Sequence, residues 1–254
     1  MQSNRNNLIL IGIAGVVLSV VGQAISLGAP TLDEGGAKLQ EWLTDNRGLA
    51  IAAFYLVGLG LMLGIGLIVA IRQRLLSAEG GSGLLANTFA LGSLLGLAVV
   101  GAGLGAFGVL AYNADTLSAE AAQILNSTVY LTIAAADFPI AIGIAAAAIV
   151  IIRTRTLHVA IGYLGLAAAL IHLVAPLAFD TGSGIASPQT ACGIAAIAYY
   201  LWMAGAGVLL LRSSEEEATV LGLAAAAVMT EVGVLAGGAA GATTSAGATA
   251  PQAN

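Results

Sequence analysis

An aspartate and a histidine lie deep inside two long apolar stretches of this sequence, and their chemistry is the most informative that the chain offers. Asp137 occurs in the stretch 128–152 and His172 in the stretch 157–178. An acid among apolar residues is costly unless it has a partner or lines a cavity. A carboxylate beside an imidazole can move a proton or hold a cationic or polar ligand. Pro139 adds to this polar spot, because it frees the carbonyl of Ala135 from its helical donor.

Spacing predicts that Asp137, His172 and Gln23 lie at one level. Each is fifteen positions from the arginine-flanked end of its stretch, counted from 137 to 152, from 172 to 157 and from 23 to 8. In a helix this separation is about 22 Å. Tyr130 lies further outward on the same face as Asp137, and Tyr199 or Tyr200 could reach the same layer from the sixth stretch. We therefore predict a polar chamber open toward the outside. The alternative is a structural hydrogen-bond cluster that ties three helices together.

Two further segments match enzyme motifs but lack the context that those motifs need. Residues 179–183 (FDTGS) match the aspartic protease signature, whose chemistry needs two carboxylates that share one proton. Residues 103–108 (GLGAFG) match the dinucleotide fingerprint, which has meaning only between a strand and a helix. The first match occurs once, at the end of an apolar stretch, and the second lies inside one. We interpret both as chance, and we predict no catalytic residue and no enzymatic activity.

Cofactor-binding patterns are incomplete in the same way. His158 and His172 are fourteen positions apart, which places them on one helix face about 21 Å apart. Two-haem membrane cytochromes use a similar spacing, but they need a second histidine pair on another helix, and this sequence has two histidines in total. The single lysine, Lys38, lies between apolar stretches, whereas a retinal protein needs a Schiff-base lysine within a helix. We predict no cofactor or metal, and haem in particular is not expected.

The elements that must position these side chains are membrane-spanning helices. Of the 254 residues, 59% are hydrophobic and 8% are charged, whereas a soluble domain carries about 25% charged residues. Crossing a bilayer takes about 20 apolar residues. Six stretches are that long: 8–28, 49–71, 84–112, 128–152, 157–178 and 189–211. The sequence therefore predicts an all-α fold, a polytopic membrane helix bundle with six transmembrane helices, and a lipid bilayer around it.

Arginines mark alternate ends of the six stretches. These ends hold six of the eight basic residues: Arg5, Arg72, Arg74, Arg153, Arg155 and Arg212. The opposite loops hold Lys38 and Arg47 together with seven acids. The positive-inside rule then predicts that the arginine-bearing ends, and the N-terminus with them, lie in the cytoplasm. Eight basic residues in a chain of net charge −5 do not suit a nucleic-acid partner.

Small residues and short amphipathic segments predict how the helices pack and connect. Glycines recur at four-residue spacing, which lets helix backbones approach closely: Gly60/Gly64, Gly92/Gly96 and Gly101/Gly105. They predict a compact bundle, or a seam with other membrane subunits or with a second copy of the chain. Between the spans, residues 37–45 and 115–125 are predicted to form short helices on the membrane surface.

The chain after Arg212 divides into two further parts, so that residues 1–212 form the transmembrane domain. Residues 213–238 begin with an acidic segment and continue as an alanine-rich stretch that contains Glu231. Because a central acid is costly in a spanning helix, this stretch is predicted to be either an interfacial helix or a seventh span. Residues 239–254 are rich in Gly, Ala, Thr and Ser and are predicted to be disordered.

This pattern of spans and charges resembles a group of small bacterial membrane proteins classed as domains of unknown function. The likeness covers most of residues 5–211 and rests on a basic pair after the second span, an acid in the fourth, and a basic turn before a glycine-bearing fifth span. The corresponding residues are Arg72/Arg74, Asp137, Arg153/Arg155, Gly162 and Gly165. The resemblance implies a multipass protein of the bacterial inner membrane and implies no activity.

Three classes of function follow from these observations. Abundant glycine and short loops favour an accessory or structural subunit of a membrane complex. The candidate residues Asp137, His172, Gln23, Tyr130 and Tyr199 favour a small transporter or channel with a polar chamber. A membrane redox or cofactor-binding protein is the third class, for which no ligand set is complete.

Overall fold

The computed structural model describes residues 2–179 and 187–213, and every regular element in these residues is helical. Six helices are long and apolar enough to cross a membrane. The prediction of an all-α membrane helix bundle with six transmembrane helices is therefore confirmed. Apart from Ser213, the predicted interfacial helix or seventh span in 213–238 and the tail 239–254 lie outside the described residues.

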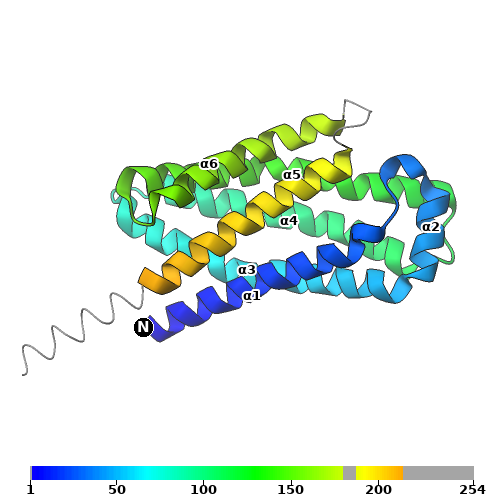
Figure 1. Ribbon diagram of the computed structural model, residues 1–254, viewed down its shortest axis with the longest axis horizontal. Helices are drawn as coiled ribbons and strands as arrows, with labels where there is room; N and C mark the ends of the chain where they lie inside the picture. The colour runs from blue at the N-terminus through cyan, green and yellow to red at the C-terminus, as the bar shows by residue number, and fades with distance from the viewer. Residues whose placement is uncertain (1, 180–186, 214–254) are drawn as a thin grey trace, which may run out of the picture. The chain divides into compact units, whose positions relative to one another are not determined.

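The helices follow one another along the chain with short connections (Figure 1). They are α1 (Gln2–Ile25), the short turns η1 (Ser26–Gly28) and η2 (Leu32–Glu34), α2 (Gly36–Asp45), α3 (Arg47–Glu79), α4 (Leu84–Tyr112), α5 (Ala119–Thr154), α6 (Val159–Val174) and η3 (Ala175–Phe179). A last helix, Pro188–Ser213, follows and is called the sixth span below. Figure 1 draws it in yellow and orange, without a label.

One end of the bundle, called the basic end below, carries Arg72 and Arg74 near the end of α3, Arg153 in the last turn of α5, and Arg155 in the connection from α5 to α6. The α3–α4 turn is closed by Glu79, whose carboxylate accepts hydrogen bonds from the first backbone N–H groups of α4, at 2.9 and 2.8 Å. Such a cap satisfies donors that a helix leaves free at its start. The side of the membrane on which the basic end lies stays a prediction from the arginine pattern.

The opposite end, called the acidic end below, is covered by α2. Leu39 and Leu43 of α2 are buried against the ends of α4 and α5, as predicted for a short helix over 37–45. An ion pair of 2.6 Å joins Arg47 to Asp115 across this end. The separate helix predicted over 115–125 is wrong: α5 begins at Ala119 and runs unbroken to Thr154. Ser118 caps its start, and the sequence that follows contains no helix-breaking residue before Pro139.

The sixth span closes the bundle by packing against four other helices. Trp202 is fully buried, stacks edge-on against Phe89 of α4 and donates from Nε1 to the carbonyl of Ile161 in α6 at 3.1 Å. One turn and a half further on, Gly207 lies against Ile13 of α1 and against Leu67 of α3. The sixth span is therefore placed to bring its own polar residues next to those of α1, α5 and α6.

Glycines set the distance between α4 and α5. A Cβ added at Gly92 would lie 2.5 Å from the carbonyl oxygen of Pro139 and 3.0 Å from Cα of Gly143. Gly96, one turn later, has no room for a Cβ beside Ile140. By contrast, Gly101 and Gly105 on the same helix have no described heavy atom within 4 Å of an added Cβ. The predicted close approach therefore occurs at Gly92/Gly96, whereas Gly101/Gly105 faces outward.

This contrast gives a matched test of close packing in α4. Gly92→Ala is expected to lower the free energy of unfolding by about 1–3 kcal/mol, because its new methyl group meets backbone atoms of α5 that cannot move aside cheaply. Gly101→Ala, which makes the same chemical change in the same helix, is expected to be neutral or slightly stabilising. Thermal unfolding in detergent measures both. Equal stability of the two variants would contradict the packing described here.

Candidate functional site

Asp137 and His172 form a buried pair between α5 and α6. Nδ1 of His172 lies 2.6 Å from Oδ1 of Asp137, and each residue is 2% exposed. The predicted proximity of the two is therefore present. The distance is at the short end for hydrogen bonds in proteins, as is typical when one partner is charged. In a medium without water such a pair is held together strongly, because neither group has an alternative partner in the lipid.

A row of aromatic and polar side chains extends from His172 toward α1. The ring of Tyr199 stands edge-on to the imidazole, with centroids 6.2 Å apart and planes at 89°. Tyr199 in turn contacts Tyr200, at a centroid distance of 5.8 Å. The amide of Gln23 then donates to the hydroxyl of Tyr200 at 2.8 Å. Gln23 thus reaches the pair through two tyrosines of the sixth span and does not touch it directly.

The pair has two polar atoms left over. Oδ2 of Asp137 and Nε2 of His172 are both buried and have no hydrogen-bond partner in the described part of the chain. Native proteins leave few buried polar atoms in this state, because each one forfeits the bonds that it makes with water. Where such atoms occur, a catalytic, proton-binding or ligand-binding role is one of the recognised explanations.

Tyr130 and Cys192 lie on the acidic-end side of the pair. Tyr130 precedes Asp137 by seven positions on α5, which is about 10 Å along the helix. Cys192 of the sixth span is buried and lies near Asp137 and Tyr130. No hydrogen bond joins Tyr130 to Asp137 or His172 within the described residues.

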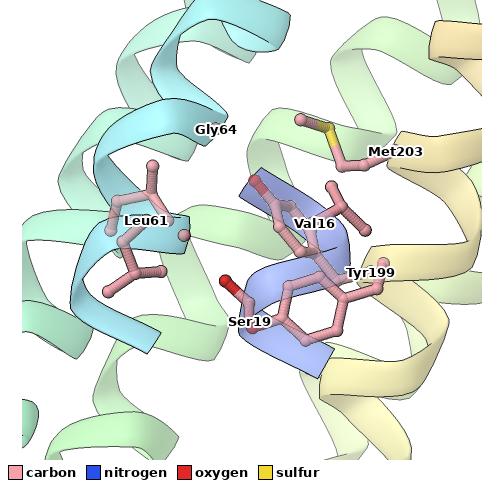
Figure 2. A pocket seen from close by; sticks show the side chains of 9 residues that line it. Val16, Ser19, Leu61, Gly64, Tyr199 and Met203 are labelled. Atoms are coloured by element: carbon pink, nitrogen blue, oxygen red, sulfur yellow. The ribbon is translucent and has the colours of Figure 1, made fainter. Parts of the chain in front are cut away.

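A small cavity lies beside the tyrosines, between α1, α3, α4 and the sixth span (Figure 2). Ser19, Tyr199 and Tyr200 give it polar groups, while Val16 and Met203 give it apolar walls. Its volume of about 10 Å³ is near the lower limit for one water molecule. Whereas the sequence predicts a chamber open toward the outside, Asp137 and His172 are enclosed, and neither of them lines this cavity.

Cys192 is the neighbour of the pair that the sequence analysis missed. It precedes Tyr199 by seven positions, so that both lie on one face of the sixth span, two turns apart. This periodicity was the signal available in the sequence. Its burial, and its place next to Asp137, depend on how the sixth span is rotated against α5, which the sequence alone does not specify.

The other residues singled out in the sequence have structural surroundings or lie outside the described residues. His158 caps α6, because its Nδ1 accepts a hydrogen bond from the backbone N–H of Ala160 at 3.3 Å. The segment matching the aspartic protease signature falls in 180–186 except for Phe179 and is not described. The glycines of residues 103–108 belong to the interior of α4.

Comparison with protein-family models, with curated proteins and with solved structures found no match to this chain. Function must therefore be inferred from the geometry of the chain itself. This geometry defines a class of protein: a multipass α-helical membrane protein with a buried carboxylate–imidazole pair.

Removing either member of the pair is expected to destabilise the bundle. Asp137→Ala or His172→Ala alone is expected to lower the free energy of unfolding by about 3 kcal/mol, because each leaves a buried polar partner unpaired. The double variant is expected to lose at least about 1 kcal/mol less than the sum of the single variants. Unfolding by heat or by detergent titration measures the three values.

Ser93→Ala is the control for this cycle. Its hydroxyl is also buried and has no hydrogen-bond partner in the described residues, so its removal is expected to change stability little. Strictly additive losses in the double variant would mean that Asp137 and His172 do not interact in the folded protein.

Proposed function

We propose that the protein is a small membrane transporter or channel, and that the Asp137–His172 pair is the site where it binds and releases a proton. The observation that carries this proposal is the combination of a 2.6 Å bond between Nδ1 and Oδ1 with buried Nε2 and Oδ2 atoms that have no partner among the described residues. A pair with a purely structural role needs the bond between the helices, but it gains nothing from two further polar atoms without partners.

We assign the exchanged proton to Nε2 of His172. With one proton between Nδ1 and Oδ1 and another on Nε2, the pair is neutral overall. Loss of the proton on Nε2 leaves a neutral imidazole bonded to the carboxylate of Asp137, with net charge −1. The bond that joins α5 to α6 is the same before and after this step. Nε2 of His172 can therefore give up and regain a proton while the packing of the helices is retained.

The size and composition of the surroundings favour a proton over a larger ligand. Asp137 and His172 are both buried, so the closed pair leaves no opening for an organic solute, and the cavity of about 10 Å³ at the neighbouring tyrosines is lined by neither of them. A metal cation needs several protein ligands. Within the described residues, no group of three or more His, Cys, Asp and Glu side chains could hold one. A proton needs only the one nitrogen, and Nε2 of His172 supplies it.

Proton flux across liposomes tests this function directly. Purified protein is reconstituted with a trapped pH-sensitive dye, and a potassium diffusion potential drives protons inward. The native chain is expected to acidify the lumen. Asp137→Asn, which keeps a hydrogen-bonding group but removes the charge that stabilises a proton on the imidazole, is expected to lower the rate by about tenfold or more.

Two controls make the result decisive. His158→Gln removes the other histidine of the chain, which caps α6 at the basic end, and is expected to keep the native rate. The unfolding temperature of Asp137→Asn in detergent establishes that the variant is folded. Native flux in a folded Asp137→Asn protein would sink the proposal, as would the absence of flux from native protein above that of empty liposomes.

A second candidate function, an accessory subunit of a membrane complex, is favoured by the outward face of α4. Gly101 and Gly105 are exposed there and have no described neighbour, although the same spacing at Gly92/Gly96 holds α4 against α5. Small residues at this spacing let a second transmembrane helix approach closely. On this reading the partner is a transmembrane helix of another membrane subunit, and the chain has no enzymatic activity.

Native mass spectrometry of protein extracted in mild detergent measures this directly. If α4 binds a partner helix, a complex of defined mass is expected, and Gly101→Leu is expected to dissociate it, because the added side chain prevents close approach. The matched variant Ile65→Leu lies on an exposed position of α3 and is expected to leave the complex intact. A native chain that is found alone would remove this candidate.

The proposal also includes the membrane and the orientation of the chain in it. Six spans imply a lipid bilayer around the chain. The arginines of the basic end and the resemblance to small bacterial multipass proteins support the inner membrane of a bacterium, with the N-terminus in the cytoplasm. In that orientation the acidic end, α2 and Cys192 lie toward the outside.

A further inference from the structure

We propose that residues 188–198, the half of the sixth span nearest the acidic end, act as a gate that opens a path past Cys192 and Tyr130 to the Asp137–His172 pair. This inference rests on the proton-binding function proposed above. A gate is required by the geometry, because Asp137 and His172 are each 2% exposed and a proton reaches a buried nitrogen only through water or another polar group.

The half of the sixth span nearest the basic end is anchored by large side chains. Trp202 and Met203 are at most 1% exposed, and Trp202 also donates its hydrogen bond to the carbonyl of Ile161. Gly165 of α6 makes room for this indole, since an added Cβ there would lie 2.7 Å from Nε1 of Trp202. Leu210 extends the same packing toward the basic end. Large, interlocked side chains of this kind hold helices together in lipid.

The half nearest the acidic end has much weaker packing. Its buried side chains are those of Ala191, Cys192 and Ala195. Ala191 and Ala195 form a cluster with Ala175 and Ala178 of η3. Each alanine contributes a single methyl group, so it makes far fewer van der Waals contacts than a Trp or Leu side chain. Segments with few such contacts are the ones that open at the lowest free energy.

A buried polar atom gives a second and independent sign of incomplete closure. Oε1 of Gln189, in the first turn of the sixth span, is buried and has no hydrogen-bond partner in the described residues. When the helix end moves outward, this oxygen becomes free to bind water. In the closed state Gln189 lacks a hydrogen bond that it can make to water in the open state. This difference lowers the free energy needed to open this end.

The path that such an opening exposes is defined by Cys192 and Tyr130. Cys192 is one turn inside the start of the sixth span, is buried, and lies near Asp137 and Tyr130. Tyr199, two turns further along the same face, stands edge-on to the imidazole of His172. Movement of 188–198 about the anchored part thus uncovers the pair from the acidic end while Tyr199 stays against His172.

Two buried alanines of the sixth span provide a matched test. Ala195 is 1% exposed in the proposed gate, and Ala206 is 0% exposed in the anchored half. Each is replaced by cysteine in a chain that carries Cys192→Ala, so that every variant has one thiol. The proteins are placed in lipid nanodiscs, where both ends of the bundle face water. The rate of modification by a small, charged methanethiosulfonate reagent is then measured.

Ala195→Cys is expected to react at least about tenfold faster than Ala206→Cys, because local opening near the acidic end precedes global unfolding. The native chain, whose thiol is Cys192, is expected to react at a rate similar to that of Ala195→Cys. Both thiols react after unfolding in dodecyl sulfate, which verifies that each is present. Equal rates at positions 195 and 206, with Cys192 no faster, would overturn the gate.

This experiment and the flux measurement fail independently. Proton flux that depends on Asp137, together with equal rates at 195 and 206, removes the gate and leaves the proposed function intact. Fast modification at 195 without any proton flux removes the function and leaves a mobile helix end. Fast modification together with flux supports both.

Discussion

The bundle depends on one constraint: a polar group inside hydrocarbon can be satisfied only by another part of the protein. Asp137 meets this constraint through a single bond of 2.6 Å to His172, and that bond joins α5 to α6 in the buried interior of the bundle. The positions of the neighbouring side chains follow from it. Tyr199 covers the imidazole, Tyr200 covers Tyr199, and Gln23 reaches Tyr200 from α1, so that four helices meet around one acid.

Around this centre the helices are held by shape more than by polar bonds. Lipid is as apolar as a leucine side chain, so burial alone does not drive the helices together. Gly92 lets α4 approach the backbone of α5, and Trp202 fills the space opposite Gly165 in α6. The result is firm contact toward the basic end and a thin layer of alanines at the acidic end of the sixth span. Because of this unequal packing, the acidic end of the sixth span can open more easily than the rest of the bundle and give water access to the enclosed pair.

How much of this could be predicted from the sequence differs from feature to feature. Spans and their number follow from hydropathy, and the level shared by Asp137 and His172 follows from the fixed rise of a helix. The link from Gln23 to the pair could be predicted only as a common depth, because the tyrosines that make it belong to the sixth span. The start of α5 was mispredicted, since residues 115–125 carry capping signals that the structure uses to begin a long helix and not a short one. The enclosure of the pair, and the place of Cys192 beside it, depend on how helices rotate against one another, which local sequence does not encode.

The position of the Trp202 indole also determines how far the acidic end of the sixth span moves for a given angle. About ten residues separate it from Cys192, a lever arm of about 15 Å. A bend of about 10° at the indole displaces the far end by about 2.6 Å, close to the diameter of a water molecule. A bend this small is well below the sharp kinks of more than about 20° that need a proline, a bulge or an inserted group in the helix. The distance between Trp202 and Cys192 thus sets how large a movement is needed before a water molecule can enter the interior of the bundle.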